Sequence, residues 1–397
     1  MAITSSSLKR RVSQFARPGI LAAGLCLLQS NALYADDNWG FQPSISQNLS
    51  WDSNPLLLST GHSTLFGSVT APQLKITDNS PTTQLNALAT VDENIFNQSD
   101  FNSTDAHGNI SLDKKLQQWE AGFTEQADYD TTRTSEVSTL DINSQGSVRH
   151  FGNSFSPTIS FSPNAVDKIS LSGAVTTSHY DGNQFTDYHI LSITPSFSYN
   201  YNPLNTATIS VLTQRYQTDV SPDLTVDSIA PTLGWSANLT PTWTAKASAG
   251  YEEYRQEGNN VPSQQWKWKP VYSADLSYNG SQDVFSLDAS KALQPYGNGT
   301  EYFLSTFSLS DNHAINPLFS VNGTASYQFA GNSDQAATNL KSLISADAGV
   351  TYHATTKVDV TTSYQYREQT LTNVQGNQND NIFMVGLVYR PVLPIIK

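Results

Sequence analysis

Residues 168–202, KISLSGAVTTSHYDGNQFTDYHILSITPSFSYNYN, contain the pattern that decides the fold. Apolar residues alternate with serine, threonine or asparagine along one arm from residue 168 and along a second arm that ends near residue 202. A period of two residues indicates a β-strand with one apolar and one polar face. The polar run at 181–184 lies between the two arms, so the stretch predicts a long β-hairpin.

Each arm is about twelve to fifteen residues long, whereas strands of soluble domains usually have about five or six. This length suits a tilted strand that crosses a bilayer. A polar face of hydroxyl and amide side chains suits water inside a barrel, and the apolar face suits lipid. The stretch therefore predicts an all-β fold, a transmembrane antiparallel β-barrel that repeats this hairpin.

The same alternation predicts about eighteen strands, with a range of sixteen to eighteen. Short connections with turn residues alternate with long polar ones, as do the periplasmic turns and extracellular loops of outer-membrane barrels. Trp39 and Trp51 bracket the first arm, where interfacial aromatic girdles lie. The expected strands are 40–53, 65–77, 82–95, 104–115, 117–130, 144–161, 167–181, 186–201, 204–218, 224–239, 241–256, 266–280, 282–294, 301–314, 316–330, 339–355, 357–370 and 379–390.

Five prolines recur inside alternate arms, each several residues before a short turn: Pro72, Pro157, Pro195, Pro231 and Pro270. A proline within a paired strand removes one hydrogen bond of the ladder. Their repetition at equivalent depth indicates a structural device, and we expect a bulge or bend in the barrel wall.

Average composition hides this pattern. The chain is 38% hydrophobic with a mean hydropathy of -0.37, and no internal apolar run reaches the roughly eighteen residues of a membrane helix. A helical membrane protein is excluded. A barrel is not, because lumen residues dilute the lipid-facing ones along every strand.

The N-terminus predicts a cleaved signal peptide over residues 1–35, followed by a barrel domain over 36–397. Basic residues precede the apolar segment 19–28, and small residues suitable for cleavage follow it. The paired Arg10 and Arg11 lack the twin-arginine context, so general secretion is favoured. Cys26 is the only cysteine and lies inside this segment, so the mature chain would hold no thiol. Export to a Gram-negative outer membrane is expected.

Charge excludes nucleic acid as a partner. The signal contains four of the 21 Lys and Arg residues, whereas all 34 Asp and Glu residues would stay, so the mature net charge is about -17. We expect acidic residues such as Asp92, Glu93, Asp100 and Asp105 in loops. There they would be solvated, or would reach surface lipopolysaccharide through divalent cations.

Alternation also selects charged residues for the lumen. This set mixes both signs, so we expect weak electrostatic steering, mild selectivity, and a neutral or weakly charged glycan rather than a strongly acidic one. The candidates are Lys168, Lys246, Lys267, Lys269, Asp275, Asp288, Asp347, Asp359, Arg367 and Arg390.

The opening WGFQPSISQNLSWDSNPLL at 39–57, the segment YDTTRTSEVSTLD at 129–141 and hairpins marked PTI, PSF and PTL resemble outer-membrane β-barrels associated with bacterial exopolysaccharide synthesis and export. The resemblance covers about residues 39 to 390 and implies an envelope role tied to polysaccharide. The end of the chain differs from the usual aromatic terminus of such barrels, because RPVLPIIK follows Tyr389.

No catalytic, metal or cofactor motif is found, and we do not expect an enzyme. Asp311, Asn312 and His313 form the nearest approach to a catalytic group, and a hydrated strand end explains them better. Three functions stay open: a conduit or accessory for exopolysaccharide export, a general porin for small hydrophilic solutes, and a structural or assembly barrel. Expected partners are outer-membrane lipid and lipopolysaccharide, the barrel assembly machinery, and for the first function polysaccharide and periplasmic export components.

Overall fold

The computed structural model describes residues 39–132, 148–182, 185–219, 224–258, 265–296, 300–331, 340–372 and 375–391. Within these ranges no helix is long and apolar enough to cross a membrane. One short 3-10 turn, η1 (Ser99–Phe101), accompanies the strands. The strands are β1 (Trp39–Asp52), β2 (Leu65–Ser80), β3 (Thr83–Phe96), β4 (Ser103–Lys115), β5 (Trp119–Thr131), β6 (Arg149–Phe161), β7 (Asp167–Tyr180), β8 (Tyr188–Asn202), β9 (Asn205–Thr218), β10 (Leu224–Asn238), β11 (Trp243–Gly258), β12 (Lys267–Asn279), β13 (Asp283–Tyr296), β14 (Thr300–Asn316), β15 (Phe319–Ala330), β16 (Leu340–His353), β17 (Val358–Leu371) and β18 (Asn377–Tyr389).

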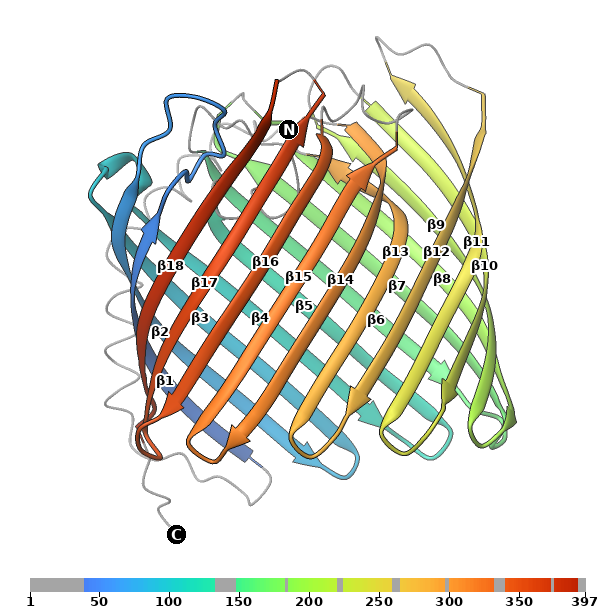
Figure 1. The fold of residues 1–397 in the computed structure, drawn as a ribbon. Coiled ribbons are helices and arrows are strands. Elements are labelled where there is room, and N and C mark those ends of the chain that lie inside the picture. The colour runs from blue at the N-terminus through green and yellow to red at the C-terminus, as the bar shows by residue number, and fades with distance from the viewer. Residues whose placement is uncertain are drawn as a thin grey trace, which may run out of the picture.

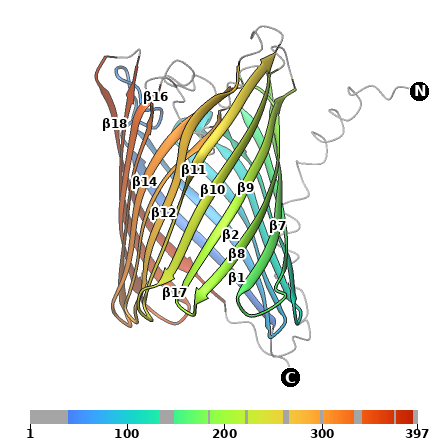
Figure 2. The same cartoon turned by 90° about the vertical axis from the view of Figure 1, so that its right-hand side faces the viewer.

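Each strand pairs with its neighbours in sequence, and β1 pairs with β18, so one 18-stranded antiparallel sheet closes on itself (Figures 1 and 2). The barrel is broader in Figure 1 than in Figure 2, so its cross-section is oval. Closure gives every strand two neighbouring strands, so the sheet has no edge strand in lipid. The long connections lie at one end and the short turns at the other.

The predicted fold class is confirmed, and every expected strand is present. Most boundaries agree within about two residues. The largest difference concerns the start of β6. The sequence predicts residue 144, and the strand begins at Arg149. The expected signal peptide over residues 1–35 lies outside the described residues.

The register gives the wall two faces. Leu49 of β1 lies opposite Val385 of β18, and these two side chains are 51% and 53% exposed on the outer face. Trp51 contacts Phe383 there, with ring centroids 5.7 Å apart. The alternate residues of β1, such as Asn48 and Ser50, form the inner face. Exposed apolar side chains on one face and polar ones on the other fit lipid outside and water inside.

The five prolines do not form bulges. At Pro72, Pro157, Pro195 and Pro231 the ladder to the next strand lacks two consecutive pairs, and the register is the same on both sides of the gap. The pairing with the preceding strand continues through each proline, as between Pro231 and Val211. The expected bulge is therefore wrong, and a bend of the wall at these prolines stays a prediction. A missing proline N–H interrupts one ladder without inserting a residue.

The end of one hairpin leaves the wall. β12 pairs with β13 only as far as Tyr272 and Lys291, and β14 pairs with β15 only from Leu304 onward. The two hairpin strands stay paired with each other up to Tyr296 and Thr300. The inward hairpin, defined by its described residues 292–296 and 300–303, is thus separated from both neighbouring strands at the long-loop end (Figure 1).

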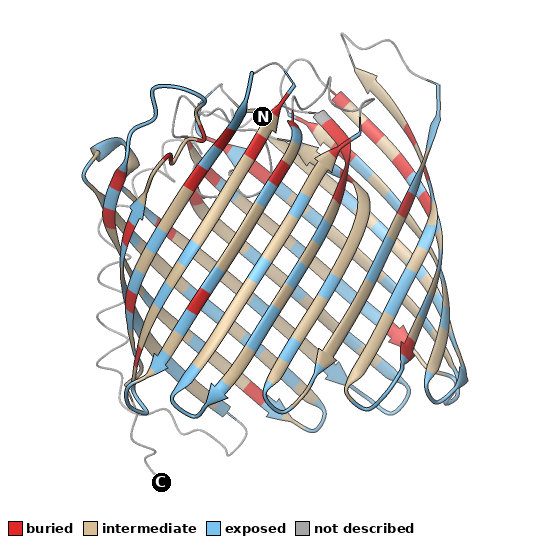
Figure 3. Cartoon of the chain, viewed as in Figure 1, coloured by how far each residue is buried: buried red, intermediate tan, exposed pale blue. Residues whose placement is uncertain are grey.

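Apolar contacts hold the inward hairpin on both sides. Leu293 and Phe303 are buried against inner-face residues of the opposite wall, including Tyr216 of β9 and Val226 of β10. On the other side Tyr302 and Leu304 pack with Ala330, Leu340, Leu343 and Leu371 of β15, β16 and β17. Figure 3 shows that buried residues gather toward the long-loop end of the barrel. The hairpin therefore crosses the barrel interior there.

Candidate channel lumen

The inner face is polar and contains more acids than bases among the described residues. Its members follow from the register, because paired residues share a face and alternate residues change face. The acids are Asp52, Asp92, Asp105, Asp113, Glu120, Asp128, Asp130, Glu252, Asp275, Asp288, Asp347, Asp359 and Asp380, and the bases are Lys75, Lys115, Lys168, Lys246, Lys267, Lys269, Arg367 and Arg390.

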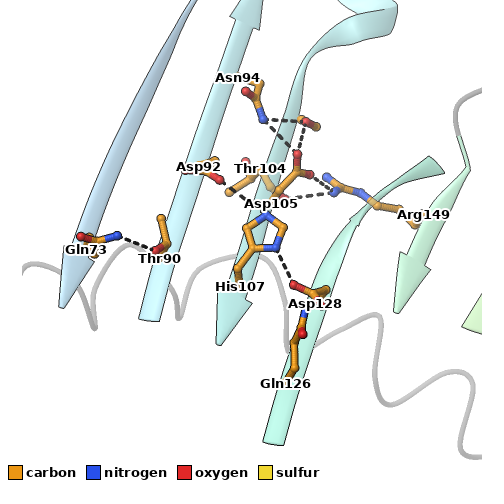
Figure 4. A network of polar contacts seen from close by, with 11 residues as sticks. Gln73, Thr90, Asp92, Asn94, Thr104, Asp105, His107, Gln126, Asp128 and Arg149 are labelled. Carbon is orange, nitrogen blue, oxygen red and sulfur yellow. Dashed lines mark hydrogen bonds and ion pairs between the residues drawn. The ribbon is translucent and has the colours of Figure 1, made fainter. Parts of the chain in front are cut away.

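A row of acids and histidines crosses β3, β4 and β5 (Figure 4). His107 Nδ1 lies 2.8 Å from Asp128 Oδ1, and its Nε2 lies 3.5 Å from Asp92 Oδ2. Gln126 donates its amide N–H to the other Asp128 oxygen at 2.9 Å. The histidine ring thus bridges carboxylates on the two strands that flank its own.

The row continues toward the long-loop end, where its members are buried. Asp105 is 1% exposed and accepts hydrogen bonds from Ser103, Asn94 and Arg149 (Figure 4). Asp130, also buried, contacts His150 Nδ1 at 3.0 Å. Each buried carboxylate therefore has polar partners, as burial of a charge requires.

A second buried group joins the two ends of the sheet. Arg367 of β17 donates to Asp380 of β18 at 2.5 Å and lies 3.7 Å from Asp52 of β1. Asp380 is fully buried and accepts two more hydrogen bonds, from the Ser53 hydroxyl and the Asn54 backbone N–H. These bonds tie the start of the first long loop to β18, close to the strand pair that closes the barrel.

Ion pairs on the rest of the inner face are more exposed. Lys168 lies 2.9 Å from Glu120, and Lys246 lies 3.9 Å from Asp275, which is too long for a hydrogen bond. Asp288 and Asp347 have no ion pair among the described residues; their recorded hydrogen bonds come from Ser286 and Asn322.

All ten candidate residues lie on the inner side of the wall. Nine are on strands, and Arg390 directly follows β18 and contacts Asp359. The structure joins Lys246 to Asp275, Arg390 to Asp359 and Arg367 to Asp380. Asp275 lies opposite Asp288 in the register. Lys267 and Lys269 lie on β12 with Asp275, whereas Asp347 lies on β16 and Lys168 on β7, so the ten residues form no single binding site.

The acids expected in loops are mostly on strands, and that expectation is wrong. Asp92 and Glu93 lie on β3 and Asp105 on β4, and only Asp100 lies in a connection, within η1. Asp92 and Asp105 face inward. Alternation could have identified them, because Asp92 shares its face with Asn86 and Thr90. Asp52, Asp380 and Glu252 were missed because they lie where strands meet long loops or the inward hairpin.

Comparison with solved structures gives only distant likeness. A BenF-like porin from Pseudomonas fluorescens Pf-5 is 10% identical, with a TM-score of 0.48 and coverage of 91% of this chain and 100% of that one. The outer-membrane channel DcaP of Acinetobacter baumannii is 12% identical, with a TM-score of 0.45 and coverage of 91% and 100%. Pseudomonas aeruginosa OpdO is 8% identical, with a TM-score of 0.46 and coverage of 89% and 98%. No curated protein matches the chain.

A family model gives the assignment. The family described as "Putative beta-barrel porin 2" matches residues 38–391, which span all eighteen strands. The lipid-compatible outer face and the closed sheet agree with a barrel of the Gram-negative outer membrane. The chain belongs to this porin family of outer-membrane β-barrels.

Proposed function

We propose that this barrel is a channel for small hydrophilic solutes with a preference for cations. The observation that carries the proposal is the polar inner face, on which acids outnumber bases among the described residues. A narrow space with an excess of one sign raises the local concentration of the opposite ion. A general porin has better support than exopolysaccharide export, because the family model that spans the strands describes a porin.

The inward hairpin supports the limit to small solutes. A lumen of eighteen strands is too wide for its own wall side chains to fill. Here Phe303 and Tyr302, each 1% exposed, pack against walls on two sides, so the hairpin occupies space that an open barrel would leave to water. A bulky polymer would meet this obstruction at the long-loop end.

A measurement of the channel's ion selectivity tests the proposal. Reversal potentials across a planar bilayer with a KCl gradient should show cation preference for the wild-type protein. The double variant D288N/D347N should reduce that preference, because it removes two inner-face carboxylates that have no ion pair among the described residues. The matched control is E93Q, since Glu93 faces outward and accepts a hydrogen bond from Thr104.

Two results would argue against the proposal. An anion preference in the wild type would show that Lys267 and Lys269 dominate the lumen. Equal selectivity in the wild type and in D288N/D347N would mean that ions do not pass along this inner surface. Deletion of the gene, with secreted polysaccharide measured, tests the export alternative, because reduced secretion would favour it.

A further inference from the structure

His107 of β4 lies between two carboxylates on the inner face. Its Nδ1 is 2.8 Å from Asp128 Oδ1 of β5, and its Nε2 is 3.5 Å from Asp92 Oδ2 of β3 (Figure 4). The three side chains are between 24% and 30% exposed. Asp105 and Asp130, the next inward residues toward the long-loop end, are buried. The His107 group, defined as Asp92, His107 and Asp128, is therefore the part of the row that water and ions can reach.

His107 is the only base that pairs with Asp92 or Asp128 in the described part of the chain. Arg149 binds Asp105 instead, at 2.8 Å, and so offsets the charge of a buried carboxylate next to the group (Figure 4). With both of its carboxylates ionised, the His107 group holds two net negative charges when the ring is neutral and one when the ring is protonated. The charge of this accessible group is therefore set by one side chain.

The ring of His107 can change its charge near neutral pH. Histidine is the side chain that ordinarily gains a proton between about pH 8 and 5. A neutral ring donates a hydrogen bond from only one nitrogen, whereas a protonated ring donates from both and so suits carboxylates on two sides. Among the described residues, the titratable groups that face it from its own strand and the two neighbouring strands are acids: Asp92 of β3, Asp105 of β4, and Asp128 and Asp130 of β5.

We propose that His107 is a specificity-determining residue of the lumen, and that protonation of its ring lowers the channel's preference for cations. A fixed charge on the wall changes the local concentration of mobile ions of both signs. A positive ring offsets one of the two accessible carboxylates, so it weakens the attraction of cations at this point of the lumen. The inference rests on the proposed channel function and adds to it a regulation of selectivity by pH.

Reversal potentials of the purified protein in planar bilayers test the inference, with the same KCl gradient at about pH 8 and at about pH 5.5. In the wild type the ratio of K⁺ to Cl⁻ permeability should fall about twofold at the lower pH, because one unit charge is added beside the ion path. H107N should keep the high ratio at both pH values, since asparagine gains no proton. H107K should give the low ratio at both, since lysine stays charged.

The matched control is H179N. His179 of β7 also pairs with an aspartate, Asp187, but it faces outward, opposite Phe151 in the register. Its replacement should leave the pH dependence of selectivity as in the wild type. Heat-dependent gel mobility would first confirm that each variant is folded, and H107Q takes the place of H107N if that variant does not fold.

Two results would overturn the inference. One is a permeability ratio in the wild type that does not change with pH. The other is a pH dependence in folded H107N equal to that of the wild type, which would assign the effect to another inward histidine, such as His150 or His353. The same recordings test the proposed function separately. Absence of cation preference at the higher pH would contradict that function, whereas a pH effect that is lost in H107N would still support the role of His107.

Discussion

At the scale of single residues, burial decides which charges contribute to stability. Arg367 is largely buried and is the only recorded cationic partner of the fully buried Asp380 within the described residues. Arg215 forms a pair of similar geometry with Asp227, with 2.7 Å between Nε and the carboxylate, but its side chain is 61% exposed on the outer face. Arg215 and Asp227 lie near the long-loop ends of β9 and β10, where water and ions can screen their pair, whereas the Arg367 pair is buried.

Replacement of these two arginines should therefore differ in effect. R367M leaves Asp380 and Asp52 buried without a counter-charge and should cost about 3–5 kcal/mol of unfolding free energy. R215M should cost about 0–1 kcal/mol. Urea unfolding in detergent or lipid vesicles measures both. Equal costs would mean that Arg367 is hydrated in the folded barrel.

The effect on stability of adding a methyl group to a glycine of the wall can also be predicted. A Cβ on Gly250 would lie 2.1 Å from the backbone oxygen of Pro231, which cannot move freely, whereas a Cβ on Gly323 would come no closer than 3.8 Å to Asp347 O. G250A should destabilise the barrel by about 1–3 kcal/mol, and G323A should change stability little. The same unfolding assay measures both. Unchanged stability of G250A would show that the backbone shifts to admit the methyl group where the ladder is interrupted at Pro231.

At the scale of elements, the inward hairpin is the feature that alternation alone did not predict. Its residues keep the strand pattern, so the sequence correctly indicated two strands at 282–294 and 301–314. Their departure from the wall depends on contacts with distant strands, such as Phe303 with Tyr254 at 5.4 Å between ring centroids. Local periodicity carries no information about such contacts, because β9–β12 and β15–β17 supply them.

Shortening the hairpin should widen the channel. Ala292 and Leu304 are partners in the register, so Asn-Gly in place of residues 293–303 would close the ladder with a two-residue turn. Single-channel conductance should rise, because the inward hairpin is removed while the β13–β14 strand pairs below it remain. Unchanged conductance would show that the hairpin does not restrict the path.

At the scale of the whole molecule, the fold could be predicted because a barrel repeats one local rule. Lipid outside and water inside impose alternation on every strand, and closure needs no further sequence signal. The lumen could be predicted only in part. Alternation identified inward residues such as Asp288 and Arg367, but the pairing of Arg367 with Asp380 depends on closure between distant segments, and so does the burial of Glu252 and Glu301.

Solute entry into proteoliposomes would show whether the inward hairpin narrows a polar lumen. Osmotic swelling would be measured with a series of neutral sugars of increasing size. We expect rapid entry of monosaccharides, a steep fall in rate with size, and a shift of that fall to larger sugars when Asn-Gly replaces residues 293–303. No swelling with any sugar would show that the lumen is closed, and equal rates for monosaccharides and long oligosaccharides in the wild type would show that the hairpin does not narrow it.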